Sequence, residues 1–314
     1  MLEAINLSKA YSVGSLGREK FYAVDNVSFQ IQEREIVSLI GESGSGKTTI
    51  GKLILKLTKP TSGKIVFNDL DITMLKSLKE YYKHVQGIFQ DPFSSYNPIF
   101  KIDRVFDMVR EEFYPSESIN SWKDKVTGVI ESIGLNPKEV LGKFPHQLSG
   151  GQLQRLLIAR ALLMETKFLV ADEIISMLDA STRIDILNIL IKLKEQGLSV
   201  LFITHDLSLG YYISDKTIIL YRGSIMEYGD TEKIFNNSAH PYTKMLLNSI
   251  PSLHQRWGNV DVSLSGRSVP AGYCKFYDRC PLGDERCKNI ELRKVEENHF
   301  AACHIHPMKY LDDN

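Results

Sequence analysis

A glycine-containing loop between an apolar strand and a helix constrains this chain more than any other feature. The segment Gly41–Thr48 fits the pattern G-x-x-x-x-G-K-[ST] at every fixed position. It follows the apolar run Ile36–Ile40, and a helix is expected over Thr49–Leu57. In such a loop the glycines turn backbone N–H groups toward phosphate, and the helix N-terminus adds partial positive charge. The sequence therefore predicts an α/β fold with a phosphate-binding loop. An ordinary Gly/Ser turn is the alternative, and the strand and helix on either side argue against it.

Residues of the loop have separate expected roles in binding ATP. Lys47 places a cation against the β- and γ-phosphates, and the Thr48 hydroxyl coordinates Mg²⁺. The other positions expected to contact the nucleotide are Gly41, Ser43, Gly44, Ser45, Gly46 and Thr49. Lys47 also counts as catalytic, because its charge meets the phosphoryl group that is transferred.

Two carboxylates end a second apolar strand, Phe168–Ala171. Asp172 at the strand end can hold Mg²⁺ through its water shell. Glu173, one residue further, can polarise the attacking water as general base. Solvated acids at a strand end are common, so this pair gains its meaning from the phosphate loop. Together the two motifs predict ATP hydrolysis.

Hydrophobic periodicity divides the rest of the chain. Alternation in Val27–Gln32 indicates a half-exposed antiparallel strand, and Gly63–Ile72 contains another strand and turn. Helical spacing in Arg104–Phe113 and Lys123–Ile133 predicts a helical insertion, and Asp185–Glu195 is a further helix. Continuous apolar runs predict buried strands of a mostly parallel sheet at Ile36–Ile40, Ile88–Phe89, Phe168–Ala171, Val200–Ile203 and Ile218–Tyr221.

Composition disfavours several classes of protein. Lys+Arg and Asp+Glu are equal at 38 each, so the chain lacks the basic excess that nucleic-acid binding usually leaves. No uninterrupted apolar run reaches membrane-spanning length, and Met1–Ile5 does not begin a signal peptide. We expect a cytoplasmic protein; if it serves a membrane, other chains must cross that membrane.

Four cysteines gather in a loop-rich segment that is expected from Pro241 onward. Cys274, Cys280, Cys287 and Cys303 are spaced C-x5-C-x6-C-x15-C. Clustering of this kind favours metal binding over scattered disulfides. Four thiolates can hold an iron–sulfur cluster, whereas structural zinc sites more often use close C-x2-C pairs. A cluster, a zinc ion and unmetallated thiols stay open as alternatives.

A second helix start with two glycines follows at Leu148–Gln152. Ser149 is expected to cap the helix, and the glycines expose backbone donors, which makes a second anion site. The string, continued by Ile158–Leu162, resembles the signature sequence of the ABC transporter ATPases. That resemblance implies that two cassettes dimerise head-to-tail and that each signature closes on the partner's ATP through Ser149, Gly150, Gly151 and Gln152.

The remaining motifs of this family appear in the same order. The resemblance implies that Tyr11 stacks on adenine, that Gln90 contacts Mg²⁺ and the water, and that His205 contacts the γ-phosphate. Gln90 and His205 thereby join Lys47 and Glu173 in the expected catalytic set.

Two residues depart from the family pattern. Ser176–Asp179 resembles the loop at the dimer seam, but Met177 stands where alanine is usual. Ile174 follows Glu173 where proline is usual. Neither change removes a reacting group, so a working site is expected, and the effect of both residues on the seam is open.

Further segments resemble the ATP-hydrolysing subunits of dipeptide and oligopeptide importers. They are Phe89–Pro98, Phe144–Gln147, His240–Leu247 and the cysteine-containing tail from Cys274 to His304. The resemblance implies a four-iron, four-sulfur cluster at the four cysteines. It also implies a second ATPase chain as a heterodimer partner, two membrane permease subunits and an extracytoplasmic solute-binding protein, with this chain at the cytoplasmic face of the membrane.

Alternatives to peptide import remain. Oligosaccharides or nickel are open as solutes, because other chains form the selecting pocket, and a homodimer is open as well. Coiled-coil arms or tandem cassettes would favour a non-transport ABC ATPase, and the sequence has neither. A basic stripe would favour it as well, but the net charge is zero. A sensor of iron–sulfur status, with hydrolysis secondary, is a further alternative.

The patterns and the resemblance together predict a P-loop ABC cassette of the α/β class. We expect a mostly parallel core sheet, an antiparallel β subdomain, a helical insertion and a small Cys-rich C-terminal segment. The cassette is expected over residues 1–245, with its helical subdomain at about 92–160, and the Cys-rich segment over residues 246–314.

Overall fold

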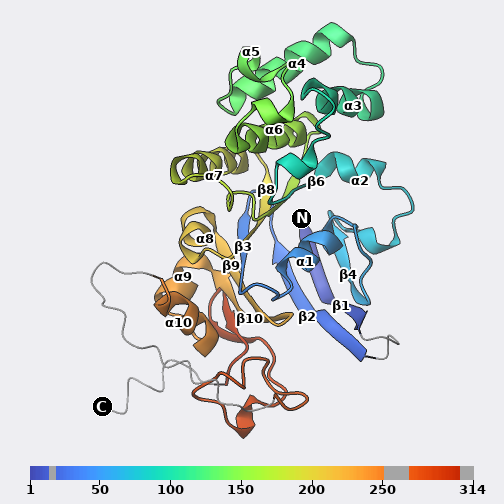
Figure 1. The fold of residues 1–314 in the computed structure, drawn as a ribbon. Coiled ribbons are helices and arrows are strands. Elements are labelled where there is room, and N and C mark those ends of the chain that lie inside the picture. The colour runs from blue at the N-terminus through green and yellow to red at the C-terminus, as the bar shows by residue number, and fades with distance from the viewer. Residues whose placement is uncertain (14–18, 251–268, 305–314) are drawn as a thin grey trace. The chain divides into compact units, whose positions relative to one another are not determined.

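The computed structural model describes residues 1–13, 19–250 and 269–304 (Figure 1). The chain divides into two compact units. The first comprises Met1–Ile31, Ile36–Thr73 and the residues from Phe202 onward, and the second comprises Gln32–Glu35 and Met74–Leu201. No helix among the described residues combines the length and the apolar composition needed to span a membrane. The expected division after residue 245 stays a prediction.

An antiparallel sheet with the strand order β2-β1-β4-β5 belongs to the first unit. Its strands are β1 (Leu2–Val13), β2 (Glu19–Ile31), β4 (Ser62–Phe67) and β5 (Leu70–Asp71). Leu2 pairs with Ile31 on one side and with Phe67 on the other, and all three are buried, while the neighbouring Glu3 is exposed. This alternation confirms the expected half-exposed antiparallel sheet.

A mixed sheet forms the core of the same unit. β3 (Ile36–Ile40) is parallel to β9 (Lys216–Tyr221), and β10 (Ser224–Asp230) is antiparallel to β9. The hairpin of β11 (Arg293–Glu296) and β12 (His299–Ala301) extends this sheet, because β12 pairs with β10. Every residue of β3 is buried, as expected for a strand covered on both faces.

Helices cover this mixed sheet and join the Cys-rich segment to it. They are α1 (Lys47–Ile54), α8 (Leu207–Ile213), α9 (Thr231–Asn236) and α10 (Pro241–Asn248), with a 3-10 turn, η4, at Glu285–Cys287. One buried cluster combines Ile40 of β3, Ile219 of β9, Tyr242 of α10 and Phe276 of the Cys-rich segment. The Cys-rich segment is therefore anchored in the core of the first unit.

Strands and helices alternate in the second unit, where β6 (Val85–Ile88) and β7 (Phe168–Asp172) are parallel. Its helices are α2 (Lys79–His84), α3 (Asp103–Phe113), α4 (Ile119–Ser132), α5 (Pro137–Val140), α6 (Gly150–Leu163) and α7 (Ala180–Glu195), with 3-10 turns η2 at Phe93–Ser95 and η3 at Pro145–Gln147. Strand β8 (Ser199–Thr204) and the turn η1 (Ile72–Met74) span the chain boundaries of the units.

The helical insertion expected from the sequence is present, with α3 to α6 drawn in green in Figure 1. Trp122, Val126 and Ile130 are buried in α4 at intervals of four residues, which places them on one helix face. These residues form the packed face of the insertion.

Several expected boundaries shift for local reasons. α1 ends at Ile54 and not at Leu57, because Lys56 has a left-handed φ of 51°. α4 begins before Lys123, because the Ser118 side chain accepts a hydrogen bond from the Ser121 N–H and caps the helix earlier.

The expectation of a loop from Pro241 onward is wrong for the first residues, which form α10. Proline suits the first turn of a helix, where its missing N–H leaves no bond unmade. The Nδ1 atom of His240 accepts a hydrogen bond of 3.0 Å from the Tyr242 N–H and caps this helix.

Candidate functional site

The phosphate loop joins β3 to α1 and closes around the Lys47 side chain. Lys47 Nζ donates to the carbonyl oxygens of Gly41 (2.7 Å) and Glu42 (3.0 Å), and the residue is 5% exposed. The Ser45 N–H donates to the Glu42 carbonyl oxygen at 3.1 Å. The buried Ser45 hydroxyl has no hydrogen-bond partner among the described residues. A buried cation, an unsatisfied hydroxyl and a helix N-terminus suit a polyphosphate ligand.

Only glycine fits at two positions of this loop. A Cβ atom on Gly41 would lie 2.2 Å from the carbonyl oxygen of Leu220. A Cβ atom on Gly46 would lie 2.1 Å from the carbonyl oxygen of Ala23, and Gly46 also has a φ of +108°. Backbone of β2 and β9 thus packs directly against the loop, which sequence spacing could not show.

The other loop residues remain accessible. Ser43, Gly44 and Thr48 are exposed, and Thr49 is half-buried in the first turn of α1. The Thr48 hydroxyl can therefore meet a hydrated Mg²⁺ ion without rearrangement of the helix.

Tyr11 and His205 are exposed residues of the first unit. Tyr11 lies on β1 with 41% of its surface exposed, and Lys9 Nζ lies 5.1 Å from its ring centroid. His205 directly follows β8. The next residue, Asp206, caps α8 by accepting hydrogen bonds from two backbone N–H groups. The solvent exposure of the Tyr11 ring and of His205 suits the stacking and phosphate-contact roles that the motifs imply.

The two carboxylates of the second unit lie where β7 ends. Asp172 is the last residue of the strand and is 6% exposed. Glu173 is half-buried and has a left-handed φ of 51°. The Ser176 N–H and hydroxyl both donate to its carbonyl oxygen, at 3.1 Å and 2.9 Å. A left-handed non-glycine residue costs about 1–3 kcal/mol and is common at functional sites. Gln90 is exposed just after β6.

The signature residues begin α6 in a reciprocal capping arrangement. The Ser149 hydroxyl accepts from the Gln152 N–H (3.2 Å), and the Gln152 side chain accepts from the Ser149 N–H (2.9 Å). A Cβ atom on Gly151 would lie 2.5 Å from Thr182 Cγ2, and one on Gly150 would lie 3.4 Å from Leu178. The expected helix cap is confirmed, and the absence of a side chain at Gly151 allows the first turn of α6 to lie close to Thr182 of α7.

The two unusual residues near Glu173 have opposite environments. Ile174 is 1% exposed, whereas Met177 is 62% exposed. Asp179 then caps α7 by accepting hydrogen bonds from Ser181 and Thr182. These hydrogen bonds, that of the Ser181 hydroxyl above all, hold the pKa of Asp179 well below its usual value. The loop therefore presents Met177 and an ionised cap at the surface.

Four cysteine side chains line one small cavity in the first unit, together with His240 and His304. All four are thiols and form no disulfide. His240 Nε2 lies 3.7 Å from Cys274 Sγ, and His304 Nδ1 lies 3.8 Å from Cys287 Sγ. The clustering of the cysteines in the sequence predicted that they lie together. That His240 and His304 lie beside them is seen only in the fold.

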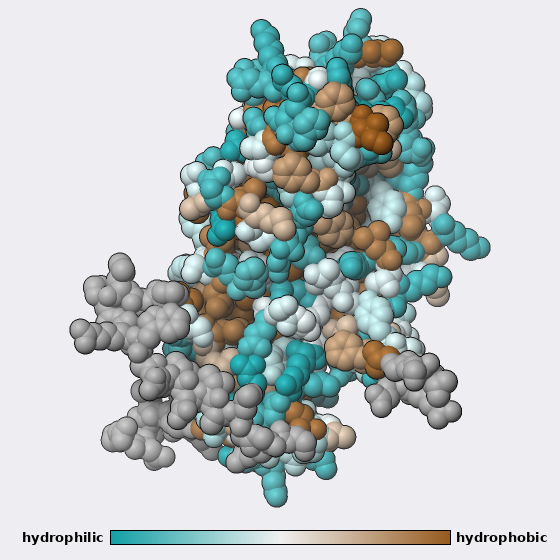
Figure 2. Space-filling view, viewed as in Figure 1, coloured by the Kyte–Doolittle hydropathy of each residue, from teal (hydrophilic) through white to brown (hydrophobic). Residues whose placement is uncertain are grey.

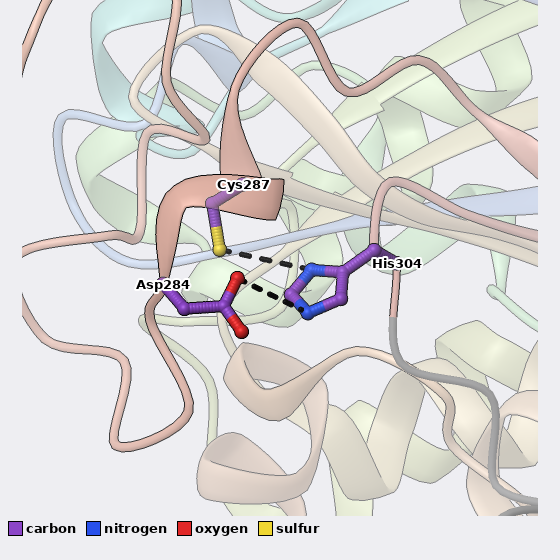
Figure 3. A group of neighbouring side chains, drawn as sticks. All are labelled: Asp284, Cys287 and His304. Carbon is purple, nitrogen blue, oxygen red and sulfur yellow. Dashed lines mark hydrogen bonds and ion pairs between the residues drawn. The ribbon is translucent and has the colours of Figure 1, made fainter.

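A second ligand set shares Cys287 and His304 with this cavity and adds Asp284, and Figure 3 shows these three side chains close together. Ligand atoms of Asp284, Cys287 and His304 all lie within 4.8 Å of one another, and His304 Nε2 is 3.5 Å from Asp284 Oδ1. Asp284 was not predicted as a ligand, because nothing in its local sequence pattern marks it as one.

Charge in this cavity is unfavourable without a cation. Burial raises the pKa of the Cys274 and Cys280 thiols to about 11. Burial also lowers the pKa of His240 to about 4, against the opposing charge of Glu227, so that the imidazole is neutral at pH 7. A bound cation stabilises thiolates. Because His240 Nδ1 accepts from the Tyr242 N–H, the proton of the neutral imidazole lies on Nε2, which faces Cys274 Sγ as a donor and not as a metal ligand. The donor set therefore fits a thiolate-bound metal centre.

An apolar groove of about 430 Å³ lies on the second unit between the turn after Gln90 and α3. Its lining includes Tyr96, Phe100, Val105, Met108, Val109 and Phe113. Phe100 and Met108 are about half exposed, and Ile99 beside them is 76% exposed. Figure 2 shows apolar side chains exposed among polar ones over the helices of this unit.

The cassette fold, the phosphate loop, the strand-end carboxylates and the capped signature helix define an ATP-binding cassette ATPase. Comparison with protein families agrees: the model described as "ABC transporter" matches residues 24–176. The model described as "Oligopeptide/dipeptide transporter, C-terminal region" matches residues 226–287.

Similar proteins give the same result at the level of the whole chain. The oligopeptide transport ATP-binding protein AppF of Bacillus subtilis is 37% identical, over 90% of this chain and 89% of its own length. The oligopeptide transport ATP-binding protein OppF of Streptococcus mutans is 40% identical, over 96% of this chain and 94% of its own. The chain therefore belongs to the family of oligopeptide and dipeptide ABC transporter ATPases.

A solved structure has the same fold. A dimeric ATP-binding cassette in a post-hydrolysis state, bound to ADP and Pi, is 29% identical with a TM-score of 0.66. The match covers 74% of this chain and 99% of that one. The expected fold class is confirmed.

Proposed function

We propose that this chain is the ATP-hydrolysing subunit that powers an ABC importer of peptides. The observation that carries the proposal is that a nucleotide-binding cassette and an oligopeptide/dipeptide-type C-terminal region occur in one chain. Relatives named as oligopeptide transport proteins cover nearly its whole length. In this proposal residues 1–245 bind and hydrolyse ATP, and residues 246–314 form the Cys-rich segment.

Each site residue has a role in phosphoryl transfer. Lys47 and the loop amides bind the β- and γ-phosphates. Tyr11 stacks on adenine, and Mg²⁺ is held by Thr48, Gln90 and Asp172. Glu173 positions and activates the water, and His205 contacts the γ-phosphate, so that the water attacks in line with the leaving oxygen.

Head-to-tail pairing with a second cassette completes the site. The N-terminus of α6, capped by Ser149, offers backbone donors to the γ-phosphate of ATP on the partner. The exposed Met177 supports a place for its loop at the dimer seam. The partner is a similar but different ATPase chain, so the assembly is a heterodimer.

The apolar groove receives a cytoplasmic helix of a membrane permease. Its lining residues come from α3 of the insertion and from the segment after Gln90. Gln90 itself contacts the water shell of Mg²⁺. Exposed Phe100 and Met108 supply the apolar contact that such a helix needs. Two permease subunits thereby hold the chain at the cytoplasmic face of the membrane, and an extracytoplasmic binding protein delivers the solute.

Four thiolates hold a four-iron, four-sulfur cluster in the cysteine cavity. Cys274, Cys280, Cys287 and Cys303 supply the ligands, and the cluster cross-links the segment. Zinc is the second candidate, because Asp284 and His304 lie beside Cys287 and form a mixed ligand set. The group has a structural or regulatory role, since no described step of ATP hydrolysis needs electrons.

Solute uptake tests the proposed function. Cells that lack this gene are expected to lose uptake of labelled oligopeptides, and the wild-type gene restores it. A gene carrying Lys47→Ala does not restore uptake, because the phosphate-binding cation is gone. Loss of oligosaccharide or nickel uptake, with peptide uptake intact, would reassign the solute. Unchanged uptake of all three would favour a non-transport ABC ATPase.

A further inference from the structure

The Cys-rich segment reaches the phosphate loop through one arginine. Arg279 lies between Cys274 and Cys280 in sequence, and its Nη1 atom lies 3.0 Å and 2.9 Å from the two carboxylate oxygens of Glu42. The same nitrogen is 3.4 Å from the Tyr221 hydroxyl. The Arg279 side chain is 18% exposed and that of Glu42 is 39% exposed, so water screens this ion pair only in part.

The side chain of Tyr242 contacts the backbone of the same loop residue, Glu42. The Glu42 N–H donates to the Tyr242 hydroxyl at 3.1 Å, and Tyr242 is fully buried in α10. Glu42 is therefore fixed at its side chain by Arg279 and at its main chain by Tyr242.

Glu42 in turn contacts the phosphate-binding lysine. Its carbonyl oxygen accepts from Lys47 Nζ (3.0 Å) and from the Ser45 N–H (3.1 Å). A displacement of Glu42 would move the acceptor that orients the Lys47 ammonium. Neither the phosphate-loop motif nor the cysteine motif assigns a role to the loop residue Glu42.

Aromatic packing makes this contact rigid. The rings of Tyr221, Tyr242 and Phe276 form a mutual cluster, with centroids 4.6 Å, 5.4 Å and 5.3 Å apart. The Arg279 guanidinium lies over two of these rings, at 5.7 Å from Tyr221 and 5.6 Å from Phe276. A turn closed by the Arg279 N–H on the Phe276 carbonyl oxygen (3.0 Å) links the arginine to the cluster.

We propose that Arg279 and Tyr242 are positioning residues for the phosphate loop, and that the Cys-rich segment thereby sets the ATP affinity of the cassette. The proposal rests on the assignment of Lys47 to the phosphates of ATP. An ion pair with a purely structural role would change only the free energy of unfolding. The Arg279 contact should also change ATP affinity, because Glu42 accepts a hydrogen bond from Lys47.

ATP binding to the intact chain tests the proposal. Arg279→Gln is expected to raise the Kd and the KM for ATP about five- to tenfold and to change kcat by less than about twofold, because ground-state and transition-state binding weaken together. Arg279→Lys keeps the charge and is expected to restore part of the affinity. Tyr242→Phe removes one hydroxyl from a buried ring and is expected to raise the Kd about two- to fivefold.

A double-mutant cycle shows whether Arg279 acts through Glu42. Adding Arg279→Gln to Glu42→Gln should raise the Kd no further, because the shared contact is already lost. Lys275→Gln is the matched control: it removes the same charge from the same segment, where Lys275 pairs with Asp25 at 2.8 Å, and its Kd should equal that of the wild type.

The outcomes separate this inference from the proposed function. Wild-type ATP affinity in Arg279→Gln and Tyr242→Phe, or additive effects of Arg279→Gln and Glu42→Gln, would overturn the inference. An equal effect of Lys275→Gln would overturn it as well. Loss of ATP binding in Lys47→Ala, measured in the same assay, would support the nucleotide site independently of Arg279. Normal ATP binding by Lys47→Ala would contradict the proposed function itself.

Discussion

Close backbone contacts explain the glycines of the phosphate loop at the scale of single residues. Gly41 has no positive φ, yet a side chain there would meet the Leu220 carbonyl oxygen at 2.2 Å. A backbone atom of a buried strand cannot move aside cheaply, unlike the end of a flexible side chain. The motif predicted glycine at this position, but its physical reason lies on a strand that is distant in sequence.

Replacing Gly41 tests this reason directly. Gly41→Ala is expected to lower the free energy of unfolding by about 1–3 kcal/mol and to weaken ATP binding. Gly128→Ala is the control, because a Cβ atom there meets no atom within 4 Å and α4 favours alanine over glycine by about 0.5–1 kcal/mol. Thermal unfolding and ATP titration measure both effects. Equal behaviour of the two variants would refute the steric explanation.

Elements with a strong apolar pattern were predictable, and polar ones were not. The runs at β3, β7, β8 and β9 lie in buried strands, so their sequence reports their environment. The hairpin β11–β12 was missed because Arg293–Glu296 is polar and mostly exposed, and its pairing with β10 comes from the fold. The cysteines of this segment were predicted as ligands, whereas Asp284 and His304 join Cys287 only in three dimensions.

Metal content tests the account of the Cys-rich segment. In protein purified without oxygen, we expect about four iron and about four sulfide per chain, with absorption at about 400 nm. Cys287→Ser should lower the iron content, while His304→Gln should not, because four thiolates suffice. About one zinc per chain, no sulfide and loss of metal in His304→Gln would replace the cluster by a mixed-ligand zinc site.

The motifs of the whole molecule fall into two groups along the chain. The phosphate loop, Tyr11 and His205 belong to the first unit, and Gln90, the two carboxylates and the signature belong to the second. The sequence predicted this inventory because each motif has a fixed local chemistry. It could not predict that Arg279 and Tyr242 reach the phosphate loop, because long-range contacts leave no local pattern.

Glu173 is the residue on which the proposed ATPase mechanism depends most directly. ATP binding and hydrolysis should be measured on the complex purified through a tag on this chain, with Lys47→Ala as the background that lacks binding at this site. We predict that Glu173→Gln binds ATP with wild-type affinity and slows hydrolysis at its own site by about 100-fold or more. Wild-type hydrolysis by Glu173→Gln, or no ATP binding by the unaltered chain, would contradict the account.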